Sequence, residues 1–202
     1  MTGAGRIVLA SRSPQRRALL GALGIEFRVV AARIEEGEDP QANALAKARE
    51  VAARSGIPTG GGVLGCDTEV IVDGRALGKP ADRDHAASML TWLSGRAHRV
   101  VSAIALLTEG DTLEGRAVTS VWVRPLSEAT MDWYLDTGEW RERAGGYAIQ
   151  GAGAALVERI DGEYSTVVGL PMGCLADLLD RAGIAPWQRS PAGRAAAQNR
   201  GG

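Results

Sequence analysis

An apolar run at residues 63–72 constrains this chain most, because a carboxylate, Asp67, stands in its middle. The run is short, apolar and bounded by turn residues, which predicts a buried strand. An ionised carboxylate removed from water needs a cation, a metal or several hydrogen-bond donors to hold it. Asp67 therefore either lies solvated at a bend of the strand or is placed in a cleft for a purpose.

The bulk composition indicates one domain with its own core and excludes several classes of protein. A chain of 202 residues buries a sizeable core without disulfides, and the two cysteines, Cys66 and Cys174, argue against a disulfide scaffold or a zinc site. A net charge of −1 lacks the basic surplus of a protein that binds nucleic acid polymers. No apolar run approaches the ~18 residues of a membrane span, and the first residues lack the apolar segment of a secretion signal. We expect a cytoplasmic protein.

The amino-terminal segment predicts a strand at residues 6–10, a polar loop, and then a helix that ends near Gly24. Ser13 suits the helix N-cap and Pro14 the first helical position. A helix start offers free backbone N–H groups to a phosphate, and the neighbouring side chains that add donors are Ser11, Ser13, Arg16 and Arg17. The alternative is an ordinary capped helix with exposed arginines.

The rest of the hydrophobic pattern predicts strands and helices in alternation. Asp73-Gly74 between apolar runs predicts a hairpin, which would return Lys79 to the region of Asp67. We expect further strands at 26–32, 98–107 and 116–124, helices at 39–56, 82–94, 127–138 and from Pro171, and a final hairpin of strands at 154–160 and 164–168.

Two irregular segments carry candidate ligand contacts. The loop at 33–39 contains Glu35 and Glu36, and such a loop is either a solvated acidic face or a source of magnesium ligands. The glycine-rich segment at 143–151 predicts close approach of the backbone to a ligand, with Gln150 facing a base edge, or else a turn with Gln150 exposed. Taken alone, Lys47 fits a surface lysine on the helix at 39–56.

Five stretches of this chain together resemble the Maf family of nucleoside triphosphate pyrophosphatases, in the order and spacing of that family: residues 9–16, 65–68, 77–80, 144–151 and 168–171. The resemblance covers roughly residues 6–183. It implies an α/β fold, a single elongated domain with a mixed twisted sheet, flanking helices and a central cleft, and a homodimer. The domain would span residues 1–185, and the Pro-, Gly- and Arg-rich residues 186–202 would form a disordered tail.

The resemblance also implies roles for individual residues. Asp67 matches the catalytic aspartate, the proton acceptor for water. The other matches are Lys47 and Lys79 as functional lysines, Ser11, Ser13 and Arg16 as the phosphate-binding loop, Glu35 and Glu36 as the acidic pair of a metal site, and Thr68 and Gln150 as positions of base selection. The cofactor would be a divalent cation, Mg²⁺ or alternatively Mn²⁺ or Co²⁺.

Thr68 and Gln150 resemble the branch that acts on dTTP and UTP, whereas the branch for 7-methylguanosine triphosphate has Gln and Glu there. One position departs from the pattern, because Gln15 stands where that branch usually has an Arg thought to influence specificity. An amide cannot replace a bidentate cation. The resemblance implies hydrolysis of dTTP and UTP, or of modified pyrimidine nucleotides, to the monophosphate and pyrophosphate, limiting the incorporation of modified nucleotides and linked to cell-division arrest. The alternatives are a nucleotide-binding regulator of cell division that does not turn its ligand over, or a pyrophosphatase for another modified nucleotide.

Overall fold

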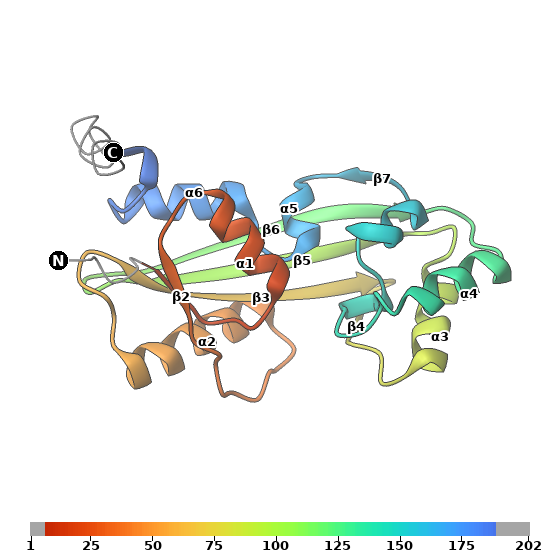
Figure 1. Cartoon of the computed structure of the whole chain (residues 1–202), viewed down its shortest axis with the longest axis horizontal. Coiled ribbons are helices and arrows are strands. Elements are labelled where there is room, and N and C mark those ends of the chain that lie inside the picture. The colour runs from red at the N-terminus through yellow and green to blue at the C-terminus, as the bar shows by residue number, and fades with distance from the viewer. Residues whose placement is uncertain (1–6, 189–202) are drawn as a thin grey trace, which may run out of the picture.

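A computed structural model of the chain describes residues 7–188. Its framework is a seven-stranded mixed sheet in the order β2-β1-β3-β5-β6-β7, with β4 paired to β3 beside this path. The strands are β1 (Ile7–Leu9), β2 (Phe27–Val29), β3 (Gly62–Val72), β4 (Arg75–Leu77), β5 (Ala97–Leu107), β6 (Thr112–Val123) and β7 (Val157–Asp161). β1 is parallel to β2 and β3, and the other pairings are antiparallel. The long strands β3, β5 and β6 run along the length of the molecule (Figure 1), which confirms the predicted mixed α/β architecture.

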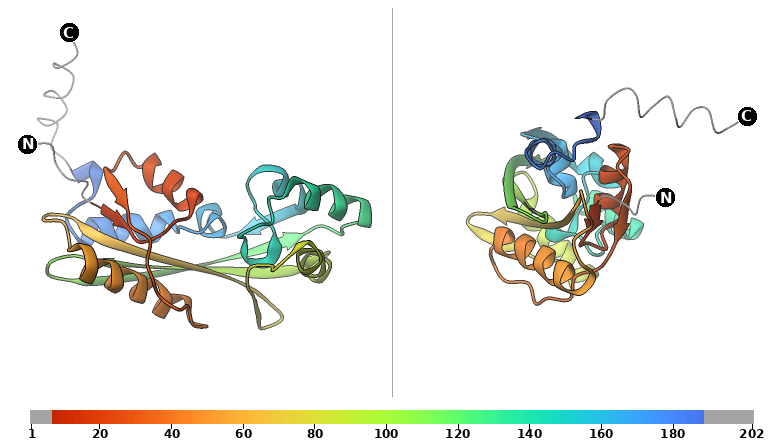
Figure 2. Two further views of the ribbon diagram at one scale, coloured as in Figure 1. Left: turned by 60° about the horizontal axis from the view of Figure 1, so that its bottom comes forward. Right: turned by 90° about the vertical axis from the view of Figure 1, so that its left-hand side faces the viewer.

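Helices cover both faces of one half of this sheet (Figure 2). α1 (Pro14–Ala22) and α6 (Met172–Arg181) pack on one face, where Leu64 and Ile104 meet Leu175. α2 (Pro40–Ser55) lies on the opposite face, where Ala48 and Val51 contact Val63. Successive residues of β3 thus point to different layers, as the period of two in a strand requires.

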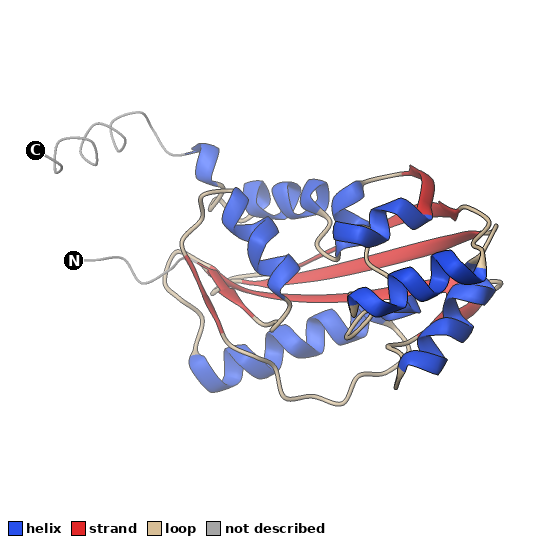
Figure 3. Ribbon diagram, turned by 45° about the vertical axis from the view of Figure 1, so that its right-hand side comes forward, coloured by secondary structure: helices blue, strands red, loops and turns tan. Residues whose placement is uncertain are grey.

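The other half of the long strands carries a second core with a separate set of helices (Figure 3). α3 (Arg83–Leu93), α4 (Glu128–Thr137) and the 3₁₀ segments η1 (Ala144–Gly146) and η2 (Gly151–Leu156) surround it. Its buried side chains include Val70 and Val72 of β3, Val100 of β5 and Tyr134 of α4. Leu64 and Val70 lie on the same face of β3, so both cores pack against that face. Residues 67–69 separate the two cores along the strand.

Most predicted elements are confirmed, and local chemistry explains why. The side chains of Ser13, Asp39, Asp82 and Ser127 each accept a hydrogen bond from the first turn of the helix that follows. Each satisfies a backbone N–H that has no partner within the helix. The Asp-Gly hairpin between β3 and β4 is also present.

The predicted final hairpin is wrong. Residues 151–156 form η2, the strand β7 begins only at Val157, and residues 164–168 form a helix, α5 (Tyr164–Val168). The β-branched residues of this segment favour a strand, but tertiary contacts override that propensity. The Thr119 hydroxyl donates to the Glu163 carbonyl at 2.9 Å, and Thr166 is completely buried against the sheet.

The predicted tail is only partly within the described residues. Pro186–Gln188 form the 3₁₀ helix η3, and residues 189–202 lie outside the described part of the chain, as do residues 1–6. Among the described residues, no helix has the length and apolar character needed to cross a membrane.

Candidate active site

The candidate site lies where the strand pairing of β3 is interrupted. One edge of this strand pairs with β1 as far as Leu64 and with β4 again from Val70. Between these pairings, residues 65–69 have no strand partner on that edge within the described chain. A cavity of about 790 Å³ opens along this interval and is lined by residues from both halves of the molecule. Its size is typical of small-molecule sites.

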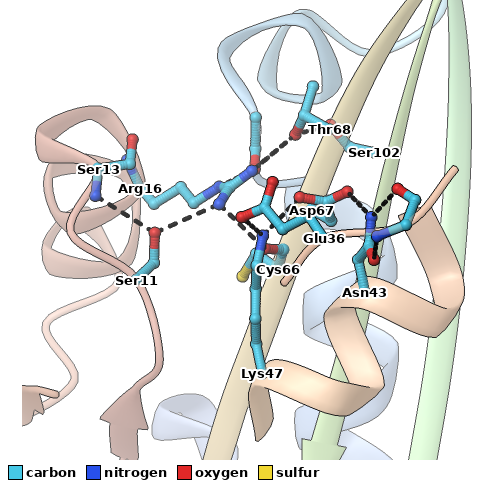
Figure 4. A network of polar contacts seen from close by, with 12 residues as sticks. Ser11, Ser13, Arg16, Glu36, Asn43, Lys47, Cys66, Asp67, Thr68 and Ser102 are labelled. Atoms are coloured by element: carbon cyan, nitrogen blue, oxygen red, sulfur yellow. Dashed lines mark hydrogen bonds and ion pairs between the residues drawn. The ribbon is translucent and has the colours of Figure 1, made fainter. Parts of the chain in front are cut away.

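Asp67 lies on the wall of this cavity and is held by two side chains of α2 (Figure 4). Lys47 Nζ is 2.6 Å from Asp67 Oδ1, and the Asn43 amide donates to Asp67 Oδ2 at 3.0 Å. Lys47 Nζ also pairs with Glu36 Oε1 at 2.8 Å. Lys47 is only 7% exposed and Asp67 9%, so these contacts supply the cation and the donor that a carboxylate in an apolar strand requires.

The sequence brings α2 this close through a glycine. A Cβ on Gly65 would lie 2.9 Å from Ala48 N and in direct collision with the Ala44 carbonyl. Only glycine therefore lets the helix approach β3 here. Asn43 and Lys47 lie four residues apart, one helical turn, so both side chains reach Asp67 from the same face.

The loop before α1 forms the second wall. The Ser13 hydroxyl accepts from Arg16 N–H at 3.4 Å and donates to Gln15 Oε1 at 3.1 Å, while Ser13 N–H donates to Ser11 Oγ at 3.2 Å. Arg12 is exposed and lines the cavity, and Arg17 does not line it. The loop thus offers Arg12 and the start of α1 to a ligand.

The Arg16 guanidinium donates several hydrogen bonds to acceptors within the protein (Figure 4). Nε donates to Gly169 O at 2.8 Å, Nη1 to Cys66 O at 3.0 Å and to Ser11 Oγ at 3.2 Å, and Nη2 to Thr68 Oγ1 at 2.9 Å. A guanidinium has five N–H groups, so one is left for a ligand. Arg16 thus joins α1, β3 and the segment after α5.

The third wall comes from the distal half of the molecule. Lys79 follows β4, is 59% exposed in its side chain, and pairs with Glu142 Oε2 at 3.0 Å. The predicted hairpin brings Lys79 to the same cavity as Asp67, but Lys79 faces Glu142 and forms no ion pair with Asp67. Gln150 is exposed and also lines the cavity.

The acidic residues are arranged differently from the sequence pattern. Glu36 lines the cavity together with Glu38 and Glu69, whereas Glu35 is exposed and does not line it. Burial and the neighbouring Asp67 carboxylate raise the pKa of Glu69. Within the described chain, no group of three or more His, Cys, Asp or Glu side chains forms a ready-made metal site.

Sequence reasoning missed two residues of this network. Asn43 holds Asp67 and also brackets the acidic loop, accepting from Gly37 N–H at 2.7 Å and donating to Gly37 O at 2.8 Å. Its position one turn before Lys47 was an available signal. Ser102 lies directly opposite Thr68 in the β3–β5 register and is fully buried, and a lone hydroxyl in an apolar strand was the signal there.

With this geometry in hand, comparison with known proteins identifies the family. The sequence model of a family described as "Maf-like protein" matches residues 6–182. The chain belongs to the Maf family. Three relatives of the chain are each named dTTP/UTP pyrophosphatase. The one from Myxococcus xanthus (strain DK1622) is 46% identical over 194 residues, covering 91% of this chain and 96% of the relative. The one from Anaeromyxobacter dehalogenans (strain 2CP-1 / ATCC BAA-258) is 44% identical over 195 residues, covering 92% and 99%. The one from Alcanivorax borkumensis (strain ATCC 700651 / DSM 11573 / NCIMB 13689 / SK2) is 41% identical over 189 residues, covering 90% and 98%.

Proposed function

We propose that this Maf protein hydrolyses UTP and dTTP between the α- and β-phosphates, releasing the nucleoside monophosphate and pyrophosphate. The observation that carries the proposal is a carboxylate, Asp67, buried between a lysine and an amide on the wall of a cavity that also presents Arg12 and Lys79. Water attack on a phosphoanhydride needs a base and charge neutralisation, and this cavity offers both. The names of the three relatives support the same reaction.

Asp67 is the base in this proposal. Lys47 pairs with its carboxylate, Asn43 fixes the plane of that carboxylate, and in this position it can accept a proton from water. Because Oδ1 faces Lys47 and Oδ2 faces Asn43, the remaining lone pairs of Asp67 are the ones that orient the water.

The phosphates would lie between Lys79 and the loop before α1 that carries Arg12. Arg12 and Lys79 carry exposed charges on different walls, while Ser11, Ser13 and the N-terminal turn of α1 add donors. Arg16, with one free N–H, contributes mainly by fixing the positions of its acceptors.

The carboxylates that the acidic loop (residues 33–39) presents to the cavity fit a divalent cation that arrives with the substrate. Magnesium is usually held by one or two carboxylates together with substrate phosphates. Glu36 and Glu38 are the carboxylates we assign, in place of Glu35, because both line the cavity. Mg²⁺, or Mn²⁺ or Co²⁺ in its place, would neutralise charge on the triphosphate when bound.

Base selection is assigned to Thr68 and Gln150, with Gln15 as a neutral neighbour. The side-chain carbonyl oxygen of Gln15 accepts a hydrogen bond from the Ser13 hydroxyl, and the side chain brings no charge to the cavity. Because Thr68 and Gln150 match the dTTP/UTP branch and the relatives are named for these substrates, UTP and dTTP should rank ahead of purine triphosphates and of 7-methylguanosine triphosphate.

The test is pyrophosphate release with Mg²⁺ across UTP, dTTP, CTP, GTP and 7-methylguanosine triphosphate. Asp67→Asn should lose at least about 100-fold in kcat. Asp73→Asn is the matched control, since Asp73 lies at the hairpin turn of the same strand and pairs with Arg96. Equal rates for wild type and Asp67→Asn would refute the assignment. A melting shift with UTP but no pyrophosphate would indicate the binding regulator instead, and 7-methylguanosine triphosphate ranking first would refute the base assignment.

We also propose that the protein acts in the cytoplasm as a homodimer and limits the incorporation of modified nucleotides, with a link to cell-division arrest. The support for these points is the family resemblance. Sedimentation at micromolar concentration checks the dimer, and a monomer there would contradict it.

A further inference from the structure

The base-selecting residue Thr68 lies at the boundary between the two hydrophobic cores, where it meets a second buried hydroxyl. Thr68 and Ser102 are directly opposed in the β3–β5 register, and their oxygens are 2.8 Å apart. Ser102 is completely buried and does not line the cavity, whereas Thr68 does. Ser102 can therefore act on a ligand only through a hydrogen-bonded neighbour, either Thr68 or the carbonyl of Thr166 in α5.

The end of α5 determines where the Ser102 proton goes. The Leu170 N–H, which would bond Thr166 O if the helix continued, instead donates to Ser165 O at 3.0 Å. This leaves Thr166 O in need of a donor, as carbonyls at helix ends are. Ser102 Oγ supplies it at 2.8 Å. Since a serine has one hydroxyl proton, Ser102 can then only accept from Thr68.

The opposite proton order is disfavoured by the distances. It would leave Thr166 O unpaired in the core and would turn the Thr68 hydroxyl toward Gly169 O, 3.4 Å away. Gly169 O already accepts from Arg16 Nε at 2.8 Å. Unpaired buried carbonyls are costly, so the chain runs from Thr68 to Ser102 to Thr166.

Thr68 thereby has no proton left for a ligand. Its hydroxyl proton goes to Ser102, and one lone pair of its oxygen accepts from Arg16 Nη2 at 2.9 Å. The remaining lone pair can only accept. Gln150 is different, because its exposed amide forms no side-chain hydrogen bond with any described residue and can rotate to present either a donor or an acceptor.

We propose that Ser102 is a specificity-determining positioning residue, which fixes Thr68 as a hydrogen-bond acceptor and so selects pyrimidines with an N3–H, uracil and thymine, over cytosine. The proposal has position 3 of the base face Thr68, where cytosine presents a lone pair, and two facing lone pairs repel. The proposal rests on the proposed function, since it explains a preference within that reaction.

The experiment compares kcat/KM for UTP and CTP in wild type, Ser102→Ala and Thr119→Ala. Removing the Ser102 hydroxyl frees the Thr68 proton to point at cytosine N3, so the UTP/CTP ratio should fall about tenfold, mostly through KM for CTP. Thr119→Ala is the matched control, because Thr119 is equally buried, lies on the next strand and donates to a carbonyl at the start of α5. It should leave the ratio unchanged.

Two further variants test the route through Thr68. Thr68→Val should lower the UTP/CTP ratio by itself, and adding Ser102→Ala to it should change the ratio no further. Ser102→Cys fills the same space with a weak donor and should give an intermediate ratio even if Ser102→Ala is poorly folded.

The outcomes separate the two proposals. Wild-type turnover of UTP with an unchanged ratio in Ser102→Ala or Thr68→Val overturns the role of Ser102 and leaves the proposed function standing. An equal change in Thr119→Ala also overturns it, because the effect would then be structural. No pyrophosphate from UTP with wild type refutes the proposed function and this inference with it.

Discussion

Replacing Gly65 by alanine should impair the site without touching any side chain in it. The added Cβ would collide with the Ala44 carbonyl and lie 2.9 Å from Ala48 N, and both are backbone atoms of α2. Normal contact distances are restored only if α2 moves away from β3 by about 1 Å. Such a shift carries Asn43 and Lys47 away from Asp67, whose contact with Lys47 is now 2.6 Å. A misplacement of about 1 Å costs about 100-fold in activity, and overpacking of this kind costs about 1–3 kcal/mol of stability.

The assay is pyrophosphate release from UTP, paired with a thermal melt of the same preparation. Gly110→Ala is the control, because a Cβ there meets no atom within 4 Å and its backbone is not left-handed. We expect Gly65→Ala to lose most of its kcat at a temperature where it is still folded. Wild-type kcat in a folded Gly65→Ala variant would show that the close approach of α2 is not what positions Asp67.

Three further predictions follow from individual side chains. Burial lowers the pKa of His98 from 6.5 to about 4. As the pH falls, the unfolded chain therefore binds a proton before the folded chain does. The stability that the neutral ring contributes above pH 6.5 is lost as the pH falls toward 4. The free energy of unfolding in urea should drop by about 2 kcal/mol more between pH 7 and pH 5 in wild type than in His98→Gln; parallel curves would contradict this. Glu142→Gln should lower KM for UTP by releasing Lys79, while the melting temperature stays the same because the ion pair is exposed; an unchanged KM would argue against a phosphate role for Lys79. Burial raises the pKa of the Cys66 thiol to about 11, so iodoacetamide at pH 8 should leave Cys66 unmodified until urea is added, as mass spectrometry of the alkylated peptides can check. Labelling of Cys66 in the native protein would show that β3 separates from the elements packed on it and exposes the thiol.

The parts of the fold that the sequence predicted are those governed by neighbouring residues. Ser13 before Pro14 and Asp39 before Pro40 place two helix starts to the residue, since capping is decided within one turn. The segment at 164–168 was mispredicted because its local preference for a strand competes with a contact from β6, which is more than forty residues away. No local pattern reports that contact.

The same distinction holds for the site. The residues predicted from family motifs lie around one cavity, with Glu35 outside it, but the contacts of Asp67 depend on the path of α2. Asn43 lies one turn before Lys47, but its contact with Asp67 also depends on the close approach of α2 that Gly65 permits. The sequence predicts Arg16 as a phosphate ligand, because sequence spacing cannot reveal that Cys66 O and Gly169 O need donors.

The unpaired edge of β3 explains why so many cations gather here and why they are not equivalent. A strand that loses its neighbour at residues 65–69 exposes carbonyl groups that must find donors. Cys66 O finds them in Arg16 Nη1 at 3.0 Å and, at 3.5 Å, in Lys47 Nζ. These two cations are therefore needed for the fold whether or not a triphosphate is present, and they hold Thr68 and Asp67 as a consequence. Arg12 and Lys79 donate to no such backbone carbonyl within the described chain. We therefore expect the phosphates of a substrate to bind these two side chains first.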